Sequence, residues 1–181
     1  MARMNVEDRI DYPREKVFET FRDNLVDLLE YLPDIQDIEV KDREEVDEDT
    51  VKVVNLWKAR EEEVPKMARK FIKPEILQWT DYATWKQDEW VCEWEMEVGF
   101  LKEAITCKGQ NRYLEAGDGS TKIHIDGDLE VDASEIPGVP RLVAGKVGSV
   151  IEDFVVKMIE PNLTDVNRGL EKYLDKESAE G

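Results

Sequence analysis

Residues 77–100, "LQWTDYATWKQDEWVCEWEMEVGF", alternate large apolar side chains with polar and charged ones and hold four of the five tryptophans. Alternation with a period of two is typical of a β-strand that has one apolar and one polar face. The apolar face comprises Trp90, Cys92, Trp94, Met96 and Val98. This stretch therefore predicts two antiparallel strands that bury one side.

The turns that follow predict how the next strands pair. Gly99-Phe100 is expected to form a two-residue hairpin loop, which pairs Trp94 with Ile105 and Cys92 with Cys107. A three-residue loop at 117–119 predicts the next register. It pairs Tyr113 with Ile123, Asn111 with Ile125, Gly109 with Gly127, Cys107 with Leu129 and Ile105 with Val131. All three strands then share one inner apolar face, and the two facing glycines allow the sheet to bend.

The rest of the chain supplies further strands and two helices. Strands are predicted at 4–12, 35–46 and 49–61, with a helix at 12–35 that ends near Pro33. Apolar residues at helical spacing over 136–174 predict one long helix, kinked or briefly broken near Glu160-Pro161. The expected fold is α+β, a strongly bent antiparallel sheet of about seven strands wrapped around the C-terminal helix. It forms a single domain over 1–176 with a flexible tail at 177–181.

Composition limits the partners. The chain has 181 residues, 38% of them charged and 41% hydrophobic, which suits one folded soluble domain. A formal net charge of −18 argues against nucleic acid as a partner, because the phosphates would be repelled. No apolar run reaches the roughly 20 residues of a membrane span, and the N-terminus is no signal peptide, so we expect a cytoplasmic protein without a cofactor.

This order of elements resembles the START-like superfamily, also called SRPBCC, helix-grip or Bet v 1-like, which includes polyketide cyclase-like and lipid-transfer proteins. Residues 53–73, "VVNLWKAREEEVPKMARKFIK", are also similar in layout to the PRELI/MSF1 group of phospholipid carriers. The resemblance implies a sheet that grips the last helix, with a cavity between them.

The tryptophans would line that cavity, because Trp is bulky and needs a partner for its indole N–H. The predicted ligand-binding residues are Trp57, Trp79, Trp90, Trp94, Met96, Asn111, Tyr113, Ile125, Val147 and Phe154. Asp81 joins them if Asp88-Glu89 is a tight two-residue turn, whereas one more turn residue places it outside. The alternative is that these apolar side chains fill a solid core.

Residues 64–73, "VPKMARKFIK", combine an apolar stripe with a basic cluster. Lys66, Met67, Lys70 and Phe71 are therefore candidates for a lid over the cavity or for transient contact with an anionic membrane surface. The alternative is a surface helix that balances the acidic residues beside it.

Signals for catalysis are weak. His124, the single histidine, is expected on the outer face, and Cys92 and Cys107 are expected in the core without a metal or nucleophile role. Gly145 and Gly148 in the C-terminal helix leave room either for a ligand or for close contact with the sheet.

Three functions remain open. The first is binding or transport of a hydrophobic small molecule, a lipid or isoprenoid, without catalysis. The second is a polyketide cyclase or aromatase type of enzyme, with Asp81, Glu103 and Tyr113 as candidate acids or bases, which a raised pKa of Asp81 would favour. The third is a protein-interaction module that uses the acidic outer face.

Overall fold

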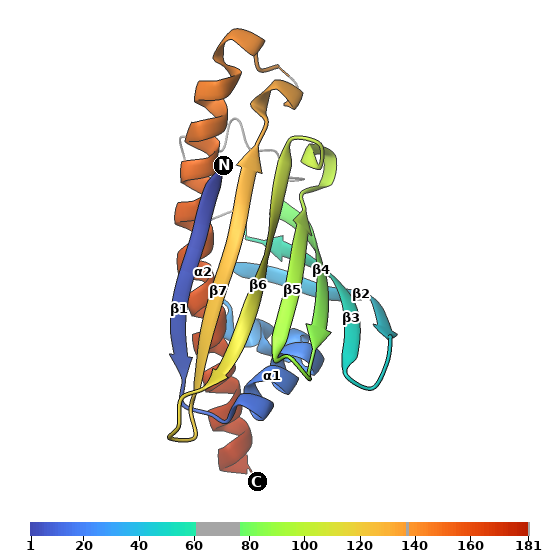
Figure 1. Cartoon of the computed structure of the whole chain (residues 1–181), viewed down its shortest axis with the longest axis vertical. Coiled ribbons are helices and arrows are strands. Elements are labelled where there is room, and N and C mark those ends of the chain that lie inside the picture. Colours follow the sequence, from blue (N-terminus) through green and yellow to red (C-terminus); the bar gives the residue numbers. More distant parts are fainter. Residues whose placement is uncertain (61–76, 137, 181) are drawn as a thin grey trace.

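The computed structural model describes residues 1–60, 77–136 and 138–180, without the side chains of 100, 150, 151, 154, 155 and 157–163. Within this range seven strands form one antiparallel sheet in the order β1-β7-β6-β5-β4-β3-β2 (Figure 1). The strands are β1 (Ala2–Ile10), β2 (Ile35–Glu45), β3 (Thr50–Ala59), β4 (Gln78–Lys86), β5 (Val91–Glu97), β6 (Ile105–Glu115) and β7 (Thr121–Val131). The predicted bent sheet is therefore confirmed.

The C-terminal helix α2 (Arg141–Glu180) lies behind the sheet in Figure 1 and contacts β1 and β7. It is one helix from end to end, and it includes residues 177–180, which the sequence assigned to the tail. Gly148 permits close contact with the sheet, because a side-chain carbon there would lie 2.8 Å from the carbonyl oxygen of Val131. None of the described helices is both long and apolar enough to cross a membrane.

The predicted helix at 12–35 is two helices. The α-helix α1 (Arg14–Asp23) stops at Asn24, whose backbone φ of −121° is not helical, and the 3-10 helix η1 (Leu25–Tyr31) follows. Asn competes for backbone hydrogen bonds and favours helix ends, so it interrupts the apolar pattern that predicted one element. The break lets Phe18 of α1 and Leu28 of η1 both be buried.

The register between β6 and β7 is confirmed. Tyr113 pairs with Ile123, Asn111 with Ile125 and Gly109 with Gly127, as the three-residue loop predicted. Pairing continues without a register shift to the turn, so the same set of alternate side chains stays on the inner face along both strands.

The register between β5 and β6 was wrong. Trp94 pairs with Gly109 and Cys92 with Asn111, because the connection spans residues 98–104 and contains the 3-10 helix η4 (Gly99–Leu101). Leu101 and Ala104, which were predicted to lie in a strand, are buried in this loop and belong to the core. The error is four residues, an even number, and the predicted inner face is therefore unchanged.

Candidate functional site

At its α1 end, the inner face of the sheet, which faces α2, is a filled aromatic core. Tyr113 is 1% exposed, and its ring packs edge-on against Phe18 of α1 with the centroids 5.2 Å apart. Trp85 and Trp90 pack against the same Phe18 ring at 5.1 and 5.3 Å. Four large rings thus close this end of the sheet around α1, as the alternative of a solid core predicted.

Trp90 has a second packing partner. The guanidinium of Arg14 lies 4.3 Å from the centre of its ring, a cation–π contact at the edge of α1. Its backbone φ of 55° is unusual for a residue other than glycine and follows from the tight turn before β5. These contacts place Trp90 where it holds α1 against the sheet.

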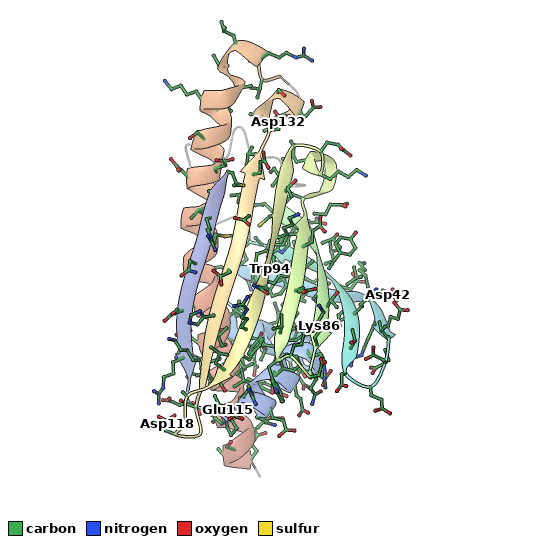
Figure 2. All side chains as sticks on the ribbon, in the orientation of Figure 1. Asp42, Lys86, Trp94, Glu115, Asp118 and Asp132 are labelled. Carbon is green, nitrogen blue, oxygen red and sulfur yellow. The ribbon has the colours of Figure 1, made fainter. Side chains whose placement is uncertain are left out.

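Trp94 lies in the middle of β5, near the centre of the sheet (Figure 2), and is 7% exposed. Its ring covers the two glycines, because a side-chain carbon on Gly109 or Gly127 would lie within 2.5 or 2.8 Å of it. Its indole N–H donates to Asn111 Oδ1 at 2.9 Å. Asn111, predicted as a polar contact for a ligand, is therefore engaged by Trp94.

The far end of the inner face is partly open. Trp57 on β3 and Trp79 on β4 are half-buried and lie opposite each other, with centroids 5.8 Å apart and planes 12° from parallel. Met96 on β5, also half-buried, is paired with Asp81 on β4. The two stacked indoles and Met96 therefore form one apolar surface, with Asp81 as the acidic residue between them.

Asp81 is on the inner face, since the observed register matches a two-residue turn at Asp88-Glu89. Its direct partner on β3 is Asn55, which is 3% exposed and donates from Nδ2 to Asp81 Oδ2 at 3.4 Å. Burial raises the pKa of Asp81 to about 6, although the nearby polar groups of Asn55 and Trp57 lower it in part. A buried carboxyl with little compensation is a typical feature of a functional site.

Three polar atoms in this cluster are buried and have no hydrogen-bond partner in the described part of the chain. They are Asn55 Oδ1, Trp57 Nε1 and Asp81 Oδ1. We call Asn55, Trp57 and Asp81 the polar triad. Asn55 was not among the predicted site residues. Its place in "VKVVNLW", on the same face as Val51 and Val53, was a signal, because a lone amide interrupts an apolar face there.

Asp8, a second carboxylate on the inner face, differs from Asp81 in having hydrogen-bond partners that lower its pKa. Asp8 on β1 accepts hydrogen bonds from Asn167 Nδ2 at 2.8 Å and from Arg168 Nη2 at 2.7 Å, both on α2. Burial acts to raise its pKa as well, but these hydrogen bonds, the backbone N–H of Arg9 and the charge of Arg168 together outweigh burial and leave the pKa of Asp8 lowered. Asp8 therefore joins the helix to the sheet, whereas Asp81 has no such cationic partner among the described residues.

The cysteines are buried and free, as expected. Burial, with Asp81 as a second cause, raises the pKa of Cys107 to about 11 and raises that of Cys92 well above its usual value. Both thiols are thus neutral at physiological pH and poor nucleophiles. Among the described residues no group of His, Cys, Asp and Glu could hold a metal ion.

The remaining predicted residues are only partly placed. Ile125 is buried beside Asn111, and Val147 is half-buried on α2. Phe154 lies on α2, but its side chain is outside the description. Lys66, Met67, Lys70 and Phe71 fall outside the described residues, and so do the predicted lid and membrane contact. Of residues 53–73, which carry the PRELI/MSF1 likeness, 53–59 lie in β3 and 61–73 fall outside the description.

The outer face is polar. His124 lies there, as expected, with its Nε2 2.5 Å from Glu7 on the neighbouring strand. A shallow hollow of about 580 Å³ opens on this side and is lined by charged groups of both signs, such as Arg3, Glu93 and Lys108. The polar triad is not part of it.

Solved structures share this fold. The Zhui aromatase/cyclase from Streptomyces sp. R1128 is 12% identical with a TM-score of 0.65, over 97% of this chain and 95% of that one. Ara h 8.0201 is 15% identical with a TM-score of 0.60, over 97% of this chain and 98% of that one. A START superfamily protein from Mycobacterium smegmatis is 12% identical with a TM-score of 0.54, over 96% of this chain and 97% of that one. At these identities the likeness establishes the fold alone.

No curated protein matches the chain. Its architecture, a bent antiparallel sheet against a long C-terminal helix, is the helix-grip fold of the START-like, Bet v 1-like superfamily. The family described as "Protein of unknown function (DUF2505)" matches residues 5–174, and the chain belongs to that family.

Proposed function

We propose that this protein binds a hydrophobic small molecule of the lipid or isoprenoid class between the far end of the inner face and α2. The observation that carries the proposal is the polar triad, three buried polar atoms without partners beside half-buried apolar side chains. Binding sites for small molecules are mostly apolar with a few placed polar groups, and this end of the sheet has that composition.

The division of the inner face supports this location. At the α1 end the rings of Phe18, Trp85, Trp90 and Tyr113 pack on one another. At the far end Trp57, Trp79 and Met96 keep part of their surface exposed. Covering that surface with an apolar ligand would stabilise the complex by roughly 25 cal/mol per Å² of buried area.

The test is titration with a fluorescent fatty acyl probe, comparing two neighbouring positions on β5. Met96 lies on the inner face and Glu95 on the outer face, so Met96→Gln and Glu95→Gln introduce the same side chain on opposite sides. We expect Met96→Gln to weaken probe binding about tenfold, because a buried amide without a partner costs about 1–3 kcal/mol. Glu95→Gln should leave the affinity unchanged, and equal effects at both positions would contradict the proposal.

A second candidate is an enzyme of the aromatase or cyclase type, which the raised pKa of Asp81 favours. A carboxyl that titrates near pH 6 can both give and accept a proton close to neutral pH. Of the other candidates, Glu103 is exposed in the loop before β6 and Tyr113 is enclosed by the aromatic core, so Asp81 would have to carry the proton transfer. A bell-shaped pH–rate profile whose acidic limb moves in Asp81→Glu would identify this activity.

A further inference from the structure

The polar triad occupies neighbouring positions on one face of two adjacent strands. Asn55 is directly opposite Asp81, and Trp57 is two residues further along β3 and therefore on the same side. The Asn55 amide donates from Nδ2 to Asp81 Oδ2, while Asn55 Oδ1 remains an acceptor without a partner. The three free atoms thus belong to one small patch.

Such a patch needs an explanation. Buried polar groups without a partner are rare in folded proteins, and each one destabilises the structure. Valine occupies the equivalent inner-face positions 51 and 53, and both side chains are buried, so an apolar side chain would suit position 55 as well. The amide and the carboxyl are therefore better explained by a ligand than by packing.

The hydrogen-bonding capacities of the triad define that ligand. Trp57 Nε1 can only donate, Asn55 Oδ1 can only accept, and Asp81 Oδ1 accepts when ionised and donates when protonated. We propose, on the basis of the proposed function, that the triad binds the hydroxyl group of an apolar alcohol or phenol. A hydroxyl has one hydrogen to donate to Asn55 and two lone pairs to accept from Trp57 and from protonated Asp81.

Other head groups fit less well. A protonated amine donates only and leaves the Trp57 N–H without a partner. A carboxylate or a fully ionised phosphate accepts only, so it leaves Asn55 Oδ1 unsatisfied, and burying its charge beside Asp81 is costly in either protonation state of Asp81. A ketone also accepts only. Below about pH 6, where Asp81 is protonated, a hydroxyl satisfies all three atoms at once, and the stacked indoles of Trp57 and Trp79 offer a flat apolar surface to the ring or chain that carries it.

The test compares three probes of similar size, 2-naphthol, 2-methylnaphthalene and 2-naphthoate, by isothermal titration calorimetry with the whole chain. We expect 2-naphthol to bind about tenfold more tightly than 2-methylnaphthalene, because the methyl group leaves the polar atoms unpartnered. The naphthoate should bind more weakly than the naphthol. Tighter binding of the naphthoate would overturn the assignment of a hydroxyl.

Variants separate recognition from folding. Asn55→Leu should bring the naphthol-to-methylnaphthalene affinity ratio to within twofold of one while keeping the affinity for 2-methylnaphthalene. Should Asn55→Leu not fold, Trp57→Phe, which keeps a ring and removes the N–H, should lower the same ratio at least threefold. The control is Tyr82→Phe, which removes an exposed hydroxyl from the outer face of β4 and should leave the ratio unchanged.

The outcomes distinguish the two proposals. Equal binding of 2-naphthol and 2-methylnaphthalene by the unaltered chain overturns the hydroxyl subsite and leaves the proposed function standing. Failure of all three probes to bind overturns the subsite, and failure of the fatty acyl probe to bind as well overturns the proposed function. A ratio that stays at tenfold in Asn55→Leu and Trp57→Phe also overturns the subsite, because discrimination would then arise elsewhere.

Discussion

Asp81 makes the free energy of unfolding depend on pH. Its pKa rises from an ordinary value of 3.8 to about 6 on folding, so between these values the folded chain binds more protons than the unfolded chain. The free energy of unfolding therefore falls as the pH rises through this window, and the loss is complete above about pH 6. At neutral pH the ionised carboxylate is a net cost to the fold.

Replacing Asp81 with Asn should remove that cost. We expect Asp81→Asn to raise the free energy of unfolding by up to about 3 kcal/mol at pH 8 and by roughly half of that at pH 5. Urea denaturation at both pH values measures the difference. Asp42→Asn, the same change at an exposed position on β2 (Figure 2), is the control, and a gain that does not depend on pH would contradict the assignment.

At the residue scale, strand alternation predicted which face each side chain occupies but not what covers it. Tyr113 and Trp57 were both expected at the site, and both lie on the inner face. Only Tyr113 is closed off by Phe18, because α1 packs over one end of the sheet and not the other. That difference depends on long-range packing, which no local spacing encodes. Asn55 could have been found from its alternation with Val51 and Val53.

At the scale of elements, Gly145 and Gly148, two of the three glycines of α2, should respond in opposite ways to the same substitution. A side-chain carbon on Gly145 would meet nothing within 4 Å, whereas one on Gly148 would lie 2.8 Å from the Val131 carbonyl oxygen. Gly145→Ala should raise the free energy of unfolding by about 1 kcal/mol, because alanine favours the helix.

Gly148→Ala should instead lower the free energy of unfolding by about 1–3 kcal/mol, because α2 has to move away from β7. Thermal or urea unfolding of the two variants, measured side by side, provides the comparison. Stabilisation by both substitutions would show that α2 does not approach β7 as closely as the structure has it.

The elements that the sequence predicted correctly are those whose signals are local. The β6–β7 hairpin follows from a turn with Gly117 and Gly119, both of which have positive φ, and its pairs were all confirmed. The length of the β5–β6 connection could not be predicted from local signals, because Leu101 and Ala104 have the apolar character of strand residues but are buried in a loop. Asn24 similarly ends α1 inside a continuous apolar pattern.

At the scale of the whole molecule, charge supports a neutral ligand. The chain carries 43 acidic and 25 basic residues, for a formal net charge of −18. A negative field of this size lowers the local concentration of anions and disfavours fatty acids and phosphorylated lipids relative to neutral alcohols. The overall fold was predictable because its strands and long helix have clear periodicities, whereas the ligand depends on three side chains brought together by pairing.

The central claim is that a hydrophobic molecule occupies the far end of the inner face. Native mass spectrometry tests it most directly, on protein purified without detergent and then incubated with an organic extract of the cells that produced it. The account predicts a species heavier than the 21.0 kDa chain that disappears on organic extraction, and a released compound that carries a hydroxyl group. If only the mass of the unliganded chain is observed after incubation with that extract, the central claim is contradicted.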